Sequence, residues 1–330
     1  MPYGQVLVDT VKDSLNNVLA PASSVFRNRF INGQMQIAQR GTSGTSGSGV
    51  PTTTATYPSV DRWFAYGTGA TVTVAQVAGA TNTKNLIQLT GAASVTGAGI
   101  GQRIEAVNCY DMAGQTVTLS ANIANSLLTT VTWTAYYASS SDVWTSSTQI
   151  ATGTFTVSAT ITNYSAQIAI PALATTGIQV IFSVGAQTSG TFQIGNAQLE
   201  VGTNATSFDY RNYGVELIMC QRYCMVYAQG QNGNTNIRAF GYNNSSTAGL
   251  PRFNFPVATR VPPTGITVST ASAFTLYSPT GGTPTAITFD AGDILGANLS
   301  VAAPSLTTGY GCILALNTAG NKIEFTGMEL

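Results

Sequence analysis

Threonine and serine alternate with apolar residues through most of this chain, and this period of two constrains its fold more than any other feature. Successive side chains of a strand point to opposite faces, so such segments predict β-strands with one wet and one buried face. The clearest segments are 71–77, 116–120, 130–136, 153–157, 164–170 and 178–184. Turn residues separate them at short intervals, which predicts an antiparallel sandwich or jelly roll.

Changes in pattern divide the 330 residues into four parts. The predicted parts are an N-terminal attachment or oligomerisation segment at 1–40, a jelly-roll domain at 41–212, a connecting helix at 213–228 and a C-terminal β domain at 229–330. The fold class is therefore all-β, a jelly-roll β-sandwich followed by a smaller C-terminal β-sandwich that a short helix joins to it.

The two non-β parts are predicted from helical spacing. Between Val11 and Leu19 the apolar residues share one face of a short helix, which is too short to be stable without a partner surface. From Tyr213 to Met225 the apolar residues again recur at helical spacing, with Glu216 near the start, where a helix favours negative charge.

Scarcity of charge excludes several functions. Only 8% of the residues are charged, the formal net charge is zero, and there is no histidine. A Ser-His-Asp triad and a histidine-ligated metal site are therefore excluded, and a phosphate-driven nucleic-acid partner is disfavoured. No apolar stretch is long enough to span a membrane, and no positively charged segment precedes an apolar one at Met1, so we expect neither membrane insertion nor a secretory signal. We expect no cofactor.

The four cysteines, Cys109, Cys220, Cys224 and Cys312, form no C-x-x-C pair. We interpret them as buried free thiols, which fits synthesis in a cytoplasm that keeps thiols reduced.

Acidic residues offer little catalytic chemistry. Asp290 and Asp293 are the closest pair and are interpreted as turn residues, with a calcium site as the alternative. A glycosidase would need two facing carboxyl groups, so we expect no enzyme and no catalytic residue.

Two motifs carry a family resemblance. The first reads Arg-Phe-Ile-Asn-Gly-Gln-Met-Gln-Ile-Ala-Gln-Arg-Gly-Thr at 29–42, followed by Asp61-Arg62-Trp63. The second runs from Gln-Leu-Glu-Val-Gly at 198–202 to Cys-Gln-Arg-Tyr at 220–223. Together they resemble the tail-fibre and related virion surface proteins of tailed bacteriophages, in which a jelly roll similar to a carbohydrate-binding module lies between the motifs.

The resemblance implies a homotrimer on the surface of the phage particle, docked to another virion protein through residues 1–40 and binding a host-surface glycan. The alternative is a structural head-fibre or capsid decoration protein without receptor binding. From the residues themselves, we expect Asp61 and Arg62 to form an ion pair on the indole of Trp63. Glu200, Arg211 and Arg222 are interpreted as structural partners.

Candidate glycan-binding residues are aromatic and amide side chains in predicted loops, because rings cover sugar CH groups and amides bind hydroxyls. They are Tyr136, Tyr137 and Trp144 in the first β domain, and Asn234, Tyr242 and Asn243 in the second, together with the Asn-rich stretches 232–236 and 242–244. For the aromatic residues the alternative is core packing, and for the Asn-rich stretches it is a solvated turn.

Overall fold

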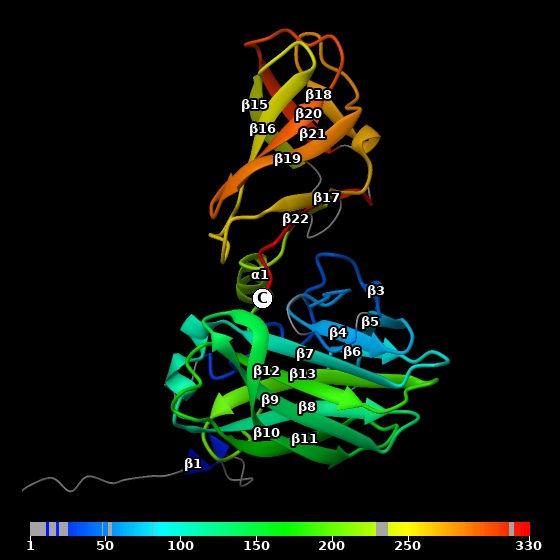
Figure 1. The fold of residues 1–330 in the computed structure, drawn as a ribbon, viewed down its shortest axis with the longest axis vertical. Coiled ribbons are helices and arrows are strands. Elements are labelled where there is room, and N and C mark those ends of the chain that lie inside the picture. Colours follow the sequence, from blue (N-terminus) through cyan, green and yellow to red (C-terminus); the bar gives the residue numbers. More distant parts are fainter. Residues whose placement is uncertain are drawn as a thin grey trace, which may run out of the picture.

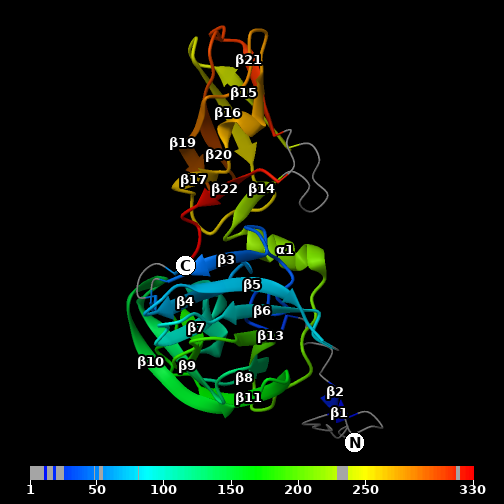
Figure 2. The ribbon, with the colours of Figure 1, turned by 90° about the vertical axis from the view of Figure 1, so that its right-hand side faces the viewer.

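The computed structural model describes residues 11–12, 18–19, 26–47, 49–51, 55–80, 82–228, 237–316 and 320–330. Most of them form two β domains stacked along the long axis, with helix α1 between them (Figures 1 and 2). The predicted all-β fold class is confirmed. Within the described ranges, no helix has the length and apolarity that a membrane crossing needs.

The first domain is a jelly roll of two packed sheets in which every described strand pairing is antiparallel. The five-stranded sheet contains, in order, β10 (Val143–Thr156), β9 (Thr130–Ser140), β12 (Ile178–Val184), β7 (Gly97–Ile104) and β4 (Phe64–Thr68). The six-stranded sheet contains β11 (Thr162–Ala169), β8 (Thr116–Asn125), β13 (Thr191–Val201), β6 (Asn85–Thr90), β5 (Val72–Ala78) and β3 (Ser43–Ser46). The short turns η1 (Ala106–Asn108) and η2 (Tyr110–Met112) follow β7.

Strand β8 illustrates why the alternating segments fold in this way. Val117, Leu119, Ala121 and Ile123 are fully buried between the two sheets. The polar residues between them point to the other face of the strand, as the period of two predicts. Burial of these apolar side chains stabilises the sandwich by about 1.5–3 kcal/mol for each large one.

Residues 26–40, which the prediction placed in the attachment segment, pack as part of the jelly roll, so this domain begins before the predicted boundary at residue 41. Phe30 and Met35 are fully buried in the sandwich core, and the Phe30 ring lies 5.3 Å from that of Trp63. The helix expected between Val11 and Leu19 is wrong for the residues described there, because β1 (Val11–Lys12) pairs with β2 (Val18–Leu19).

The predicted ion pair on the Trp63 indole is also wrong. Asp61 accepts hydrogen bonds from the backbone and side chain of Gln39, at 3.0 and 2.7 Å. Arg62 turns the other way, and its guanidinium lies 3.7 Å from the ring centroid of Tyr223. Trp63 donates its indole hydrogen to the Asn32 carbonyl oxygen at 3.0 Å. Asp61 and Arg62 therefore make separate contacts and form no ion pair with each other.

The second domain is a smaller β-sandwich, as predicted. Its three-stranded sheet contains β14 (Met225–Ala228), β22 (Lys322–Thr326) and β17 (Gly265–Val268). Its six-stranded sheet contains β18 (Phe274–Tyr277), β21 (Gly311–Leu316), β15 (Ile237–Asn243), β16 (Ala248–Asn254), β20 (Gly296–Ala302) and β19 (Ala286–Asp293). The short turn η4 (Ala271–Ala273) precedes β18. Phe253, Leu299 and Phe325 pack in the core between the sheets.

The connecting helix α1 (Tyr213–Gln221) is shorter than the predicted 213–228. The side chain of Asn212 caps its start by accepting from the Gly214 N–H at 3.0 Å. Residues 225–228 are strand β14 instead, because they pair with β22 of the second domain. Cys220 and Cys224 are buried free thiols, as expected, and so are the other two cysteines.

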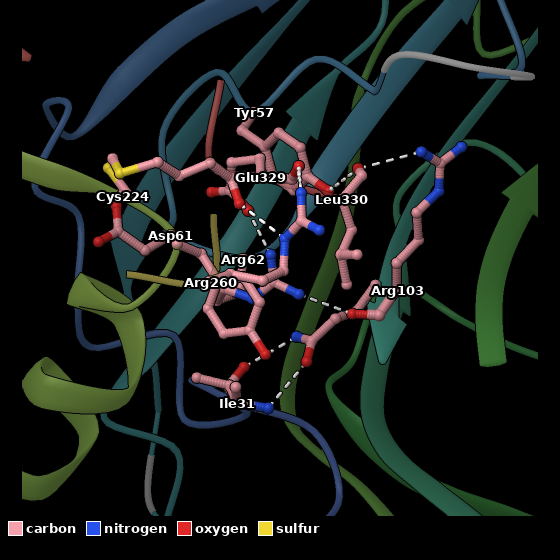
Figure 3. Close-up of polar contacts among 12 residues, drawn as sticks. Ile31, Tyr57, Asp61, Arg62, Arg103, Cys224, Arg260, Glu329 and Leu330 are labelled. Atoms are coloured by element: carbon pink, nitrogen blue, oxygen red, sulfur yellow. Dashed lines mark hydrogen bonds and ion pairs between the residues drawn. The ribbon is translucent and has the colours of Figure 1, made fainter. Parts of the chain in front are cut away.

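Residues 328–330 join the two domains (Figure 3). The Glu329 carboxylate forms ion pairs with Arg62 of the first domain and with Arg40, the latter at 3.1 Å. The Leu330 carbonyl oxygen accepts from Tyr57 Oη at 2.9 Å and from Arg103 Nη1 at 3.0 Å. We call these contacts the Glu329 joint.

Other contacts surround the Glu329 joint. Arg260 of the second domain donates to the carbonyl oxygens of Met328 and Glu329, at 2.9 and 2.7 Å. Gln39 Nε2 donates to the Cys224 carbonyl oxygen at 2.8 Å, and Arg222 pairs with Glu105 at 2.9 Å. The first pair of contacts holds the second domain to residues 328–329, and the other two hold the first domain to the turn that follows α1.

We predict that Glu329→Gln lowers the free energy of unfolding by about 3 kcal/mol, because it leaves the buried Arg62 guanidinium without its counter-charge. Denaturant unfolding followed by tryptophan fluorescence measures the loss. The control is Asp111→Asn, which breaks the exposed ion pair with Arg29 and is expected to cost less than about 1 kcal/mol. Equal losses in the two variants would contradict the prediction.

A second prediction concerns pH. Burial raises the pKa of the Asp61 carboxyl to about 6, despite the opposing effects of Arg40 and Gln39. The folded protein therefore holds this proton more tightly than the unfolded chain, so stability is lost as pH rises from 4 to 6. Relative to Asp61→Asn, the wild type should lose about 3 kcal/mol of unfolding free energy over this range. A difference between the two proteins that does not change with pH would refute it.

Candidate functional site

Glycines of β7 shape the outer face of the five-stranded sheet. A Cβ atom built on Gly99 would lie 2.5 Å from Tyr66 Cε1, and one built on Gly101 would lie 2.5 Å from Phe64 Cζ. Their lack of side chains therefore lets the two rings of β4 lie directly over the neighbouring strand.

These rings belong to a small apolar cluster on this outer face, separate from the sandwich core. Ala55, Tyr57, Phe64, Tyr66 and Ile181 are buried in it, and Tyr136 packs against it. Burial raises the pKa of Tyr66 to about 12, so its phenol stays neutral and can donate a hydrogen bond at any physiological pH.

A row of three polar side chains crosses the sheet beside this cluster. In the strand register Tyr136 of β9 lies opposite Gln179 of β12, which lies opposite Arg103 of β7. Directly opposed residues point to the same face, so the three side chains form one line. Arg103 Nε donates to Gln179 Oε1 at 2.7 Å, which fixes the amide with its NH₂ group directed away from the guanidinium.

Trp144 reaches the same row from β10. The pairing of β10 with β9 shifts register between Val143 and Ser147, and such a bulge redirects side chains. The Arg103 guanidinium lies 4.9 Å from the centroid of the Trp144 ring. Trp144 is only 5% exposed, and its indole Nε1 has no hydrogen-bond partner among the described residues.

Together these residues line a pocket of about 300 Å³, which we call the Trp144 pocket. Its lining includes Arg103, Tyr136, Trp144, Gln179, Ile181 and the hydroxyl groups of 145–147. Arginine 103 is its charged member, and burial lowers the pKa of this guanidinium without discharging it. Two aromatic rings, an amide and several hydroxyls suit an uncharged, hydroxyl-rich ligand.

Of the first-domain candidates, the structure brings together Tyr136 and Trp144 but not Tyr137. All three lie in strands β9 and β10, so the expected loop is wrong. Tyr137 lies opposite Ile178 and packs against the sandwich core, because neighbouring residues of a strand face opposite sides. Core packing, the alternative, therefore holds for Tyr137.

The second-domain candidates do not form one site. Asn234 lies outside the described residues, as does all of 232–236. Asn243 is wrong as a binding residue, because it is 0% exposed and its amide donates to Ser278 Oγ and the Thr307 carbonyl oxygen. Tyr242 is 53% exposed on β15, away from the Trp144 pocket.

The remaining sequence candidates are structural. Asp293 accepts from the Leu295 N–H at 2.7 Å and pairs with Arg252 at 2.8 Å, which confirms its turn role. Asp290 instead occupies a bulge of β19. The described residues contain no cluster of three or more potential metal ligands.

Glu200, Arg211 and Arg222 also act as structural partners, as interpreted. Glu200 accepts from the backbone and hydroxyl of Thr206, Arg211 pairs with Glu216 at 3.3 Å, and Arg222 pairs with Glu105.

Sequence reasoning missed Arg103 and Gln179 as members of the pocket. Gln179 lies in a segment that the alternation identified as a strand, between the apolar residues Ile178 and Val180, so its parity pointed to the outer face. Arg103 follows the polar Gln102 and lies outside the alternating segments, so the pattern gave no such signal for it.

We predict that Gly99→Ala lowers the free energy of unfolding by about 1–3 kcal/mol and displaces the Tyr66 ring, because the new methyl group overlaps that ring. Gly97→Ala is the matched control on the same strand, since a Cβ there would meet only the Val184 carbonyl oxygen, at 3.8 Å. Denaturant unfolding and the side-chain NMR signals of Tyr66 measure both effects. An unmoved ring in Gly99→Ala would be the contrary result.

No protein-family model matches the chain, and no curated protein sequence matches it either. Among solved structures, the chain is similar to one described as CBM4, with 12% identity and a TM-score of 0.34 over 52% of this chain and 98% of that chain. A family 22 carbohydrate binding module from Clostridium thermocellum matches with 14% identity and a TM-score of 0.33, over 44% and 89% of the two chains. The enzymatically active domain of tailspike protein 4 from bacteriophage CBA120 matches with 15% identity and a TM-score of 0.35, over 53% of this chain and 22% of that chain. At these values the likeness establishes no function for this chain.

Proposed function

We propose that this chain is a bacteriophage virion fibre protein that binds glycans of the host surface without cleaving them. The observation that carries the glycan-binding part is the Trp144 pocket. There, the row of Tyr136, Gln179 and Arg103 meets a buried indole whose N–H has no acceptor among the described residues. A sugar hydroxyl can accept that hydrogen bond while the rings contact the CH face of the sugar.

The lack of acid chemistry in the pocket supports the non-catalytic part. Among the described residues that line it, none is an aspartate or a glutamate. Most glycosidases hydrolyse the glycosidic bond with a pair of carboxyl groups that flank it. The pocket can therefore bind a sugar, but it offers no acid and base to cleave it.

The two sequence motifs that resemble phage virion surface proteins support the assignment to a virion. Residues of both motifs, including Arg40, Arg62 and Arg222, form the scaffold that joins the two domains. The residues that bind the glycan then lie outside the two motifs, as Trp144 does. The homotrimer, the contact of residues 1–40 with another virion protein and the position on the particle surface are parts of the same proposal. Imaging of labelled particles and sedimentation of the purified chain test them.

We predict that Tyr136→Ala and Gln179→Ala each weaken glycan binding at least about tenfold, because each removes a contact worth about 1.4 kcal/mol. Trp144→Ala should abolish binding. Screening the full chain on an array of bacterial surface glycans, followed by calorimetry, measures the effect. Tyr110→Ala is the matched control, because Tyr110 is exposed and lies outside the Trp144 pocket.

Trp144 is buried, so its variant is interpreted only if its circular dichroism and melting match the wild type. Tyr136 and Gln179 keep the test independent of that condition. If the wild type binds no glycan, the structural head-fibre or decoration role replaces the proposal. Release of reducing ends from host polysaccharide would instead identify a depolymerase.

A further inference from the structure

A second hollow lies on the other sheet of the jelly roll. It has a volume of about 410 Å³ and is lined by Asn82, Asn122, Asn163, Asn196, Phe208 and Tyr210, with neighbouring serine and threonine side chains. Asn122 lies between the buried residues Ala121 and Ile123, so it points to the outer face of the six-stranded sheet. The sandwich core thus separates this hollow, which we call the Asn196 groove, from the Trp144 pocket.

Strand register brings the amides together. Asn163 of β11 lies opposite Asn122 of β8, and its Nδ2 donates to Asn122 Oδ1 at 2.9 Å. Asn122 Nδ2 in turn donates to Thr83 Oγ1 at 2.6 Å. The amide of Asn122 is therefore held in one orientation, while Asn163 remains exposed at the mouth of the groove.

Among the residues that line the groove, Asn196 gives the evidence for a ligand. It lies in the bulge of β13 between Gly195 and Gln198, and its backbone adopts the left-handed region, with φ of 44°. Its Nδ2 donates to the Asn82 carbonyl oxygen at 2.7 Å and to Tyr210 Oη at 3.3 Å. Asn196 is 6% exposed, yet its Oδ1 has no donor among the described residues. A buried amide oxygen without a donor is unfavourable, and a ligand hydroxyl would supply one.

Aromatic rings form another wall of the groove. Phe208 and Tyr210 pack edge to face with their centroids 4.9 Å apart. Tyr210 Oη donates to the Asn82 carbonyl oxygen at 2.8 Å, which fixes the ring although more than half of its surface is exposed. An exposed ring held in place beside amides can contact the CH face of a sugar with little loss of entropy.

The charge of the lining selects the ligand class. All of the described residues that line the Asn196 groove are uncharged, and the nearby Glu200 is occupied by Thr206 and Gln198. A carboxylated or phosphorylated ligand would lose hydration there without gaining a counter-charge. We infer that the Asn196 groove is a second, independent binding site for a neutral saccharide, on the sheet opposite the Trp144 pocket.

The experiment compares variants of the full chain on an array that carries neutral, uronic-acid and sialylated oligosaccharides. Asn163→Ala and Phe208→Ala should each reduce binding to a set of neutral glycans at least about tenfold. The matched control is Asn204→Ala, an exposed asparagine outside the groove, which should leave that binding unchanged. Asn163 is exposed and contributes one side-chain bond, so its variant is expected to fold even if Phe208→Ala does not.

Tyr136→Ala separates the two sites. Neutral glycans that depend on Asn163 but not on Tyr136 support the second site. If every glycan depends on Tyr136 and none on Asn163, the second site is overturned while the proposed function stands. Dependence on Asn163 alone retains the second site and removes the Trp144 pocket. A groove that holds only acidic glycans, or a chain that binds no glycan, overturns the inference.

Discussion

The carboxylate of Glu329 is the contact on which the arrangement of the two domains depends. It faces two arginines, Arg40 and Arg62, and the second of these is almost entirely buried. Two charges removed from water are costly unless they are paired, so this geometry tolerates little displacement. The chain has few charges, and several of them lie at this junction. There, their ion pairs fix how the two domains are oriented.

Arg103 connects this junction with the Trp144 pocket. One edge of its guanidinium donates to the Leu330 carbonyl oxygen, its Nε donates to Gln179, and its face lies near the Trp144 ring. The position of the second domain and the shape of the pocket therefore share one side chain. Displacement of residues 328–330 would remove a hydrogen bond that holds Arg103 in place.

Much of the fold follows from local sequence, because the period of two is a property of neighbouring residues. The same parity separates Tyr136 from Tyr137 and Tyr242 from Asn243, so strand assignment alone could have removed one candidate from each pair. It could not place Trp144, whose direction is set by a bulge, nor join Gln179 with Arg103, which lie 76 residues apart. The role of residues 26–40 escaped prediction because Phe30 meets its partner Trp63 only in the folded sandwich.

The Glu329 joint also sets an order of assembly. Its contact between Arg40 and Glu329 spans 289 residues of sequence, whereas every strand of the jelly roll lies before residue 202. During synthesis the first sandwich can therefore close before the residues that clamp it to the second domain have left the ribosome. Contacts between residues so far apart in sequence form slowly, so the junction forms after the strands of the jelly roll. Until then, Arg62 lacks its counter-charge, and the first domain lacks the stabilisation that this ion pair supplies.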